Sequence, residues 1–323
     1  MQGIVAQQRA DVVTATALAA MAESYVKFLD VRSASVRTYA NAVRQFVRWV
    51  DEKGIRNPDR LDVIAWREDM TKSGKKAATV QTYIVAVRLF FRWTSQEGLY
   101  PNIADHVKGV KVSRYHKKDP LTANQAAEVL HQVKQRGDLV GLRDYAIIST
   151  ALAGGLRTIE IVRANKGDLR TRAQESGPDL HLLNLQGKGR DDADEFVIIP
   201  EKVYKAIAAY LKARGRSRDS DPLFASTSNR NKGGRMTTRS VSRIVKNALI
   251  EAGLESERLT AHSLRHTAGT LALKGGQPIQ DVQQFLRHAN IDTTMIYIKE
   301  ADRLENKGSQ TVADAIFKEE ADT

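Results

Sequence analysis

Apolar residues recur every three or four positions in two segments of the N-terminal half of the chain. They are Val36, Tyr39, Val43, Phe46 and Val50 in the first segment, and Val80, Tyr83, Val87 and Phe90 in the second. Steps of three and four place such residues on one face of an α-helix. The pattern therefore predicts two amphipathic helices, each of which buries one face in a core.

The two segments also repeat one another residue by residue. TYANAVRQFVRW in the first is matched by TYIVAVRLFFRW in the second, 44 residues further on. Opposite the apolar stripe each copy carries two arginines four positions apart, Arg44 and Arg48 and then Arg88 and Arg92. Such guanidinium groups are suited to DNA phosphates or base edges, and the alternative is a solvated face on two ordinary amphipathic helices. The other candidate DNA-binding residues are Arg37, Lys75 and Lys76.

The second half of the chain combines helical patterns with two short strands. Residues 141–153 read as an apolar helix that ends at Gly154 and Gly155. DLHLLNL and EFVIIP read as strands, and the intervening GKGRDDAD reads as a hairpin turn. Helical patterns dominate again from Glu201 onward. The sequence thus predicts a mainly α protein with a small antiparallel β-sheet, in the α+β class.

A basic stretch without a clear period, KGVKVSRYHKKDP, separates two predicted domains. Just after it, Thr122 and Gln125 fit a capping box that begins a new helix. A length of 323 residues also favours about two domains. We expect a helical DNA-binding domain over residues 1–110, a linker over 111–119 and a second domain over 120–323. That domain is expected to end in a short tail helix capped by Ser309.

Charge and composition narrow the class of protein. The chain has 50 Lys and Arg against 38 Asp and Glu, a net charge of +12, which favours a polyanionic partner such as nucleic acid. The absence of cysteine from the sequence excludes disulfides, thiol catalysis and cysteine-ligated zinc. The sequence shows neither a signal peptide nor a long apolar run typical of a membrane span. We expect a soluble, cytoplasmic protein that associates with the nucleoid.

Six candidate catalytic residues occur in the second domain, between Arg157 and Tyr297. His262 and Arg265 are three positions apart, so a helix places them on one face. Pro278 is well placed to begin the helix that leads to His288. His262 and His266 lack the intervening glutamate of H-E-x-x-H zinc sites, so no metal site is expected. The six candidates are Arg157 in GGLRTIEI, Lys188 in LQGKGR, His262 and Arg265 in HSLRH, His288, and Tyr297.

Taken together, GLRxxE, a hairpin lysine, HxLRH and a histidine followed nine residues later by tyrosine resemble the tyrosine recombinase (phage integrase) family. The resemblance covers the second domain from about Pro120 to Tyr297. The helix pair with its arginines is similar to the family's N-terminal, SAM-like core-binding domain. One position departs from the family pattern, because Arg287 stands where LGH would place a glycine.

The resemblance implies a covalent mechanism of DNA strand cleavage. Tyr297 would attack a DNA phosphorus, leaving a 3′-phosphotyrosyl link and a free 5′-hydroxyl, so that rejoining needs no ATP. Arg157 and Arg265 would clamp the non-bridging oxygens of the phosphate. No cofactor is expected.

The resemblance also implies roles for the remaining candidates. Lys188 would protonate the 5′-oxygen leaving group, and His262 would accept or donate a proton near the tyrosine. His288 would donate a hydrogen bond to the phosphate. Glu160 is interpreted as a residue that orients its neighbours, and His266 as structural.

We therefore expect a site-specific recombinase of the simple two-domain, Xer-like form, because only about 15 residues precede the first helix near Thr14. Its partner would be double-stranded DNA with a specific site, bound by a homotetramer on two duplexes with no membrane involved. The outcome would be integration, excision or resolution of a mobile element, plasmid or chromosome dimer. The alternatives are a type IB topoisomerase that relaxes DNA and a catalytically silent DNA-binding relative. The tail helix is expected to dock into a neighbouring protomer, or else onto its own domain.

Overall fold

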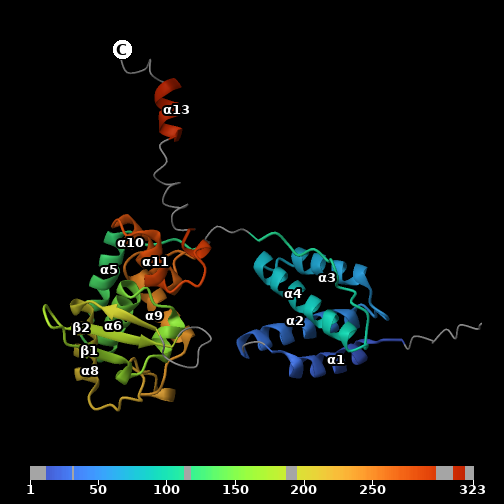
Figure 1. The fold of residues 1–323 in the computed structure, drawn as a ribbon, viewed down its shortest axis with the longest axis horizontal. Coiled ribbons are helices and arrows are strands. Elements are labelled where there is room, and N and C mark those ends of the chain that lie inside the picture. Colours follow the sequence, from blue (N-terminus) through green and yellow to red (C-terminus); the bar gives the residue numbers. More distant parts are fainter. Residues whose placement is uncertain (1–11, 31–32, 113–117, 187–194, 296–307, 317–323) are drawn as a thin grey trace, which may run out of the picture. The chain divides into compact units, whose positions relative to one another are not determined.

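The computed structural model describes residues 12–30, 33–112, 118–186, 195–295 and 308–316 of the chain (Figure 1). The chain divides into two compact units, Met1–Arg114 and Tyr115–Thr323. Among the described residues, no helix is long and apolar enough to span a membrane.

The N-terminal unit is helical throughout its regular part. Its helices are α1 (Ala15–Phe28), α2 (Ser33–Glu52), α3 (Arg60–Lys72) and α4 (Ala77–Gln96). The predicted apolar stripes of α2 and α4 form its core, which confirms the two amphipathic helices. The stripe residues that are fully or almost fully buried are Val43, Phe46, Val50, Val80, Val87 and Phe90.

Tyr83 belongs to the predicted stripe of α4 but is only half-buried. Its hydroxyl accepts hydrogen bonds from Asn41 Nδ2 at 3.1 Å and from Gln45 Nε2 at 2.9 Å, both on α2. Its ring lies parallel to that of Trp66 on α3, with 6.3 Å between ring centroids and 11° between planes. An amphipathic side chain of this kind packs its ring inward and keeps its hydroxyl at the polar surface.

The chain that follows α4 stays in contact with the helices of the N-terminal unit as far as Val110, which packs against their core. Arg60 Nη2 donates to the His106 carbonyl at 3.3 Å, and Arg67 Nη1 donates to the Lys108 carbonyl at 2.6 Å. In the C-terminal unit, Asp119 Oδ2 accepts from Arg258 Nε at 2.6 Å. Each unit thus anchors its own end of the basic stretch.

The C-terminal unit combines helices with one three-stranded antiparallel sheet of order β1-β2-β3. This arrangement confirms the predicted α+β class. Its elements are α5 (Ala123–Lys134), α6 (Leu139–Ala153), α7 (Thr158–Arg163), a 3-10 turn (Lys166–Asp168), β1 (Leu169–Arg172), β2 (Leu180–Leu185), β3 (Glu195–Ile199), α8 (Glu201–Arg214), a 3-10 turn (Asn229–Asn231), α9 (Thr238–Glu251), α10 (Ala261–Lys274), α11 (Ile279–Leu286) and α13 (Gly308–Ile316).

The sheet contains both predicted strands and one strand that the sequence analysis missed. β2 and β3 pair in the register Leu183↔Val197, and β1 pairs with β2 in the register Leu169↔Leu183. β1 has the sequence LRTR with three exposed residues, so it lacks the apolar alternation that identifies a strand. The predicted hairpin turn, with Lys188, lies outside the described residues.

Local signals place several helix ends where the sequence predicted them. Thr122 and Gln125 form the predicted capping box, with the Thr122 N–H donating to Gln125 Oε1 at 2.9 Å and the Gln125 N–H donating to Thr122 Oγ1 at 3.2 Å. Helix α6 ends at Ala153 with Gly154 as its C-cap, and Pro278 directly precedes α11. In this unit α10 and α11 lie at one end and α8 at the other (Figure 1).

The tail helix differs from its prediction in one detail. It begins at Gly308, so Ser309 lies within its first turn and does not cap it. The apolar side chains of Val312 and Ile316 are 57% and 67% exposed. The predicted nucleophile, Tyr297, lies outside the described residues.

Candidate active site and nucleic-acid interface

Arg157 stands at a sharp turn between two helices of the C-terminal unit. Helix α6 ends at Ala153, and Arg157 is the residue that precedes α7. Between them Gly155 has a positive φ of 56°, and a Cβ there would lie 2.7 Å from Leu286 Cδ2. Glycine therefore allows both the turn and the close approach of the end of α11.

The carboxylate of Glu160 holds Arg157 in place from inside the protein. Glu160 is fully buried, and its Oε1 accepts from Arg157 Nη1 at 2.6 Å. Its Oε2 accepts from the Arg157 backbone N–H at 2.8 Å and from Arg287 Nη2 at 3.1 Å. Burial would raise the pKa of Glu160, but Arg287 and Arg157 hold that pKa below its usual value. The carboxylate thus stays charged and orients two guanidinium groups.

Arg265 joins the turn before α7 to the end of α11. It lies on α10 and is 1% exposed. Its Nη1 donates to the Gly155 carbonyl at 2.7 Å, and its Nη2 donates to the Leu286 carbonyl. His262, one helical turn earlier on α10, is exposed, so the predicted pair reaches from the buried turn to the surface.

His288 lies next to this cluster, just past the end of α11. A hydrogen bond of 2.9 Å joins its Nδ1 to Oγ1 of Thr294, which is fully buried. Burial and the positive charges of Arg265, Arg157 and Arg287 lower the pKa of His288 to about 3. The imidazole is therefore neutral at neutral pH and surrounded by arginines.

The backbone conformation at Arg287, the position that departs from the family pattern, shows why glycine is suited to it. Its backbone is left-handed, with φ 54° and ψ 47°, and it forms the C-cap of α11. Non-glycine residues seldom adopt this conformation. The sequence analysis did not identify Arg287 as a site residue, although an arginine at a family glycine position was the available signal.

Four of the six predicted catalytic residues come together in this arrangement, drawn from three segments of the chain. Arg157, Arg265 and His262 all act on the charge state of His288. Lys188 and Tyr297 lie outside the described residues. Within the described part of the chain, no three His, Asp or Glu side chains gather as metal ligands would.

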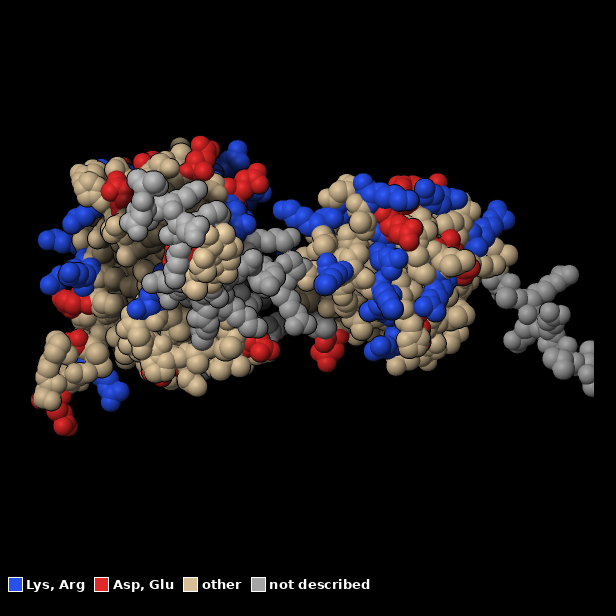
Figure 2. Space-filling model, turned by 90° about the horizontal axis from the view of Figure 1, so that it is seen from above, with Lys and Arg blue, Asp and Glu red and all other residues tan. Residues whose placement is uncertain are grey.

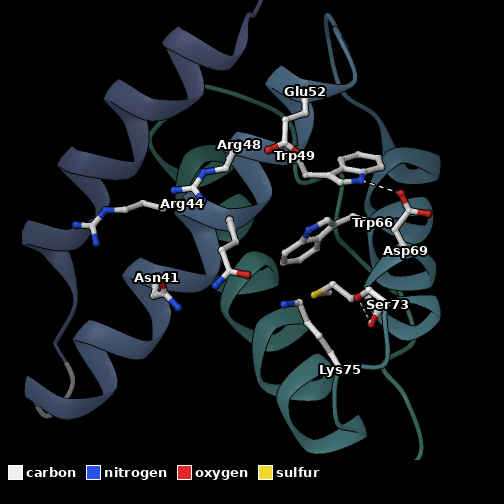
Figure 3. A pocket seen from close by; sticks show the side chains of 11 residues that line it. Asn41, Arg44, Arg48, Trp49, Glu52, Trp66, Asp69, Ser73 and Lys75 are labelled. Atoms are coloured by element: carbon white, nitrogen blue, oxygen red, sulfur yellow. Dashed lines mark hydrogen bonds between the residues drawn. The ribbon is translucent and has the colours of Figure 1, made fainter.

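The N-terminal unit carries a separate pocket of about 380 Å³ between α2, α3 and the loop before α4 (Figure 3). Arg44 and Arg48 extend from α2, and Lys75 extends from the loop (Figure 3). Aromatic rings of Trp49 and Trp66 form part of the wall. The pocket is lined by Asn41, Arg44, Gln45, Arg48, Trp49, Glu52, Trp66, Asp69, Met70, Ser73 and Lys75.

The other predicted DNA-binding residues lie outside this pocket. Arg37, Lys76 and Arg92 are exposed, whereas Arg88 is half-buried. Lysine and arginine side chains gather on one face of the N-terminal unit, with fewer acidic side chains among them (Figure 2). The pocket itself combines cationic side chains with side-chain amides. Both kinds of group can contact DNA phosphates and base edges.

Comparison with known proteins identifies the family. The phage integrase family matches residues 119–303, and the phage integrase N-terminal SAM-like domain matches residues 22–98. The chain therefore belongs to the phage integrase family, as its motifs predicted.

Several relatives are tyrosine recombinases. XerD of Rickettsia conorii is 31% identical over 199 residues, 59% of this chain and 63% of that protein. XerC of Caldanaerobacter subterraneus subsp. tengcongensis is 36% identical over 156 residues, 48% of this chain and 40% of that protein. XerD of Bifidobacterium longum is 29% identical over 277 residues, 82% of this chain and 86% of that protein. The first two matches thus span less than two thirds of the relatives' lengths.

Solved structures share the fold at low sequence identity. The XerH recombinase bound to its palindromic difH substrate has a TM-score of 0.70 and 20% identity, covering 95% of this chain and 85% of that chain. A lambda integrase tetramer bound to a Holliday junction has a TM-score of 0.65 and 15% identity, covering 89% and 78%.

Proposed function

We propose that this chain is a site-specific DNA recombinase that cleaves and rejoins strands through a 3′-phosphotyrosyl link on Tyr297. The observation that carries the proposal is the gathering of Arg157, Arg265 and His288 where the turn before α7 meets the end of α11. Arg157 lies more than a hundred positions before Arg265 and His288 in the sequence, and all three are in the part of the chain that matches the phage integrase family.

The cluster suits the non-bridging oxygens of a phosphodiester. Arginine remains charged at all relevant pH values and presents a planar fork of donors to phosphate. When Thr294 donates to Nδ1 of the neutral His288 ring, the ring proton sits on Nε2, which can donate to a third acceptor position. Two fixed charges and one neutral donor can thus stabilise the charge that grows on a pentacoordinate phosphorus.

The covalent step is an exchange of one phosphate ester for another. The Tyr297 oxygen forms a bond to phosphorus while the bond from phosphorus to the 5′-oxygen breaks. His262 takes the phenol proton, and Lys188 supplies a proton to the departing 5′-oxygen. Rejoining reverses both transfers, so that the energy of the phosphodiester is kept and no nucleotide is consumed.

The wider assignment follows from the same reasoning. We assign residues 1–110 to a core-binding domain that contacts duplex DNA, 111–119 to a linker and 120–323 to a catalytic domain. The DNA-bound XerH recombinase and the lambda integrase tetramer on a Holliday junction support a homotetramer that holds two duplexes. Integration, excision or resolution of a DNA element would be the outcome.

Trapping the covalent intermediate tests the proposal. Nicked duplexes drawn from the source genome are incubated with the protein in EDTA, and adducts are resolved on denaturing gels and sequenced. We expect adducts at a defined site with the unsubstituted chain, and none with Tyr297→Phe, which should still bind DNA. Tyr204→Phe is the matched control, because Tyr204 stacks on His181 with 3.5 Å between centroids and should not be the nucleophile.

Each contrary result has a distinct meaning. No adduct from the unsubstituted chain would overturn the proposal. An adduct from Tyr297→Phe would assign the nucleophile elsewhere, although Tyr210 is an unsuitable substitute because it is buried and its hydroxyl accepts from the Ala225 N–H at 3.0 Å. Relaxation of supercoiled DNA with no preferred site would favour a type IB topoisomerase.

A further inference from the structure

The guanidinium of Arg287 is directed into the protein. Its side chain is 6% exposed. Its Nη1 donates to the Phe285 carbonyl at 2.7 Å, and its Nη2 donates to Glu160 Oε2 at 3.1 Å and to the Gly155 carbonyl at 3.2 Å. These contacts bind the Arg287 guanidinium to Glu160, to the end of α11 and to the turn before α7.

The backbone conformation of Arg287 is energetically unfavourable for a non-glycine residue. A left-handed conformation is strained for a residue with a Cβ, and glycine adopts it freely. Strained residues persist only where their surroundings hold them, and they concentrate at functional sites. The side-chain contacts of Arg287 are therefore the compensating interactions at this position.

Arg287 both accepts and donates hydrogen bonds between two catalytic segments. Its carbonyl accepts from Arg157 Nη2 at 2.9 Å, while its guanidinium binds the carboxylate that holds Arg157. The three residues Arg157, Glu160 and Arg287 thus form a closed ring of polar contacts. His288 is the next residue in the chain, so the ring connects the segment of Arg157 to the segment of His288.

We propose that Arg287 is a positioning residue for strand cleavage, which fixes Arg157 relative to His288 through Glu160 and the carbonyls of the turn. The inference rests on the proposed function. Catalytic groups displaced by about 1 Å can lose roughly a hundredfold in rate. A residue that joins the two segments is therefore expected to affect the cleavage rate without affecting DNA affinity.

Arg287→Gly isolates the role of the guanidinium. Glycine keeps the left-handed turn without strain, so only the side-chain contacts are lost. Single-turnover cleavage of the nicked substrate should fall by roughly tenfold to a hundredfold at neutral pH. DNA affinity, measured on an uncleavable Tyr297→Phe background, should be unchanged.

A pH profile separates positioning from a general loss of stability. Arg157 and Arg287 are the charged groups that act on Glu160. Without Arg287 the pKa of Glu160 should rise, so that its carboxylate is neutralised and releases Arg157 at a pH where the unsubstituted chain is still active. The acid limb of the cleavage profile should therefore move to higher pH in Arg287→Gly. Arg287→Lys keeps the charge but loses the planar guanidinium. Its acid limb should therefore return toward the pH of the unsubstituted chain, and its cleavage rate should recover in part.

Arg136→Ala is the matched control for stability. Arg136 pairs with Asp144 at 2.9 Å and with Glu251, at the opposite end of α6, about 22 Å of helix from Gly154. The Arg136→Ala variant should have a lower melting temperature, and the acid limb of its cleavage profile should be unchanged.

A folded Arg287→Gly with the unsubstituted rate and profile would overturn the inference. So would a loss of DNA affinity, or a lower melting temperature with unchanged cleavage in both Arg287 variants. If the unsubstituted chain formed no adduct, the proposed function would fail first and this inference with it.

Discussion

Glu160 Oε1 accepts a hydrogen bond from Arg157 Nη1 at 2.6 Å, and the two residues are three positions apart in the turn that begins α7. The same carboxylate accepts from the Arg157 backbone N–H at 2.8 Å. Because Glu160 is fully buried, water does not compete for these contacts. The side chain and the main chain of Arg157 are thus held by one group before any DNA is bound.

Replacing Glu160 by glutamine should destabilise the protein and slow cleavage. The amide keeps the shape but leaves the guanidinium groups of Arg157 and Arg287 without a buried counter-charge. Removing one partner of a buried ion pair costs about 3–5 kcal/mol, so the melting temperature should fall clearly. Thermal unfolding and adduct formation measure the two effects. Glu201→Gln is the control, because Glu201 is an exposed carboxylate that pairs with Lys205 at 3.1 Å, and an equal loss there would contradict the prediction.

His288 should make the fold sensitive to acid. Its pKa is about 3 in the folded chain against an ordinary value of 6.5, so between these values the unfolded chain binds a proton that the folded chain does not. Stability from this residue is therefore present above the unfolded pKa and is lost as the pH falls below it. The slope contributed by one such group is at most about 1.4 kcal/mol per pH unit. Denaturant unfolding of His288→Gln should show a shallower acid dependence than the unsubstituted chain, and parallel curves would refute the prediction.

The arginines of α2 should contribute to DNA affinity through charge. If Arg44 and Arg48 contact phosphates, each alanine variant should lower the slope of log affinity against log salt by roughly one unit. If one of them reads guanine, specificity should relax at a single base pair instead. Fluorescence anisotropy across salt concentrations distinguishes the two.

The same test applies to Arg88 and Arg92. The control is Lys205→Ala, which removes a positive charge from α8, where Lys205 is exposed and paired with Glu201. Unchanged affinity, slope and site preference in all four arginine variants would support a merely solvated face.

The tail helix should act in assembly. Val312 and Ile316 expose apolar surface on a helix of 9 residues, and a helix this short needs a surface to pack against. Removing residues 310–323 should leave binding to a single site intact, weaken cooperative binding and abolish recombination between two sites. Native gels with one-site and two-site DNA measure each step.

A paired substitution refines the test of the tail. Val312→Ser with Ile316→Ser should reproduce the truncation, whereas Thr311→Ala on the same helix should not. A truncated chain that still forms synaptic tetramers and recombines at the normal rate would show that the tail does not couple protomers.

The amino-acid sequence by itself determined the features that depend on neighbouring residues. The stripes of α2 and α4 follow from the helical repeat, and the start of α5 follows from a capping box within four residues. The end of α6 follows from Gly154. Motif resemblance also identified the family, because short stretches such as HSLRH retain their order along the chain.

Only the tertiary structure decided how these segments meet. β1 is a strand because β2 lies beside it, since its own residues LRTR carry no apolar alternation. Arg287 reads in the sequence as a missing glycine, whereas in the fold it binds Glu160 across 127 positions. Periodicity and capping act over a few residues of one segment, but a buried ion pair forms only when packing brings distant segments within about 3 Å and excludes water.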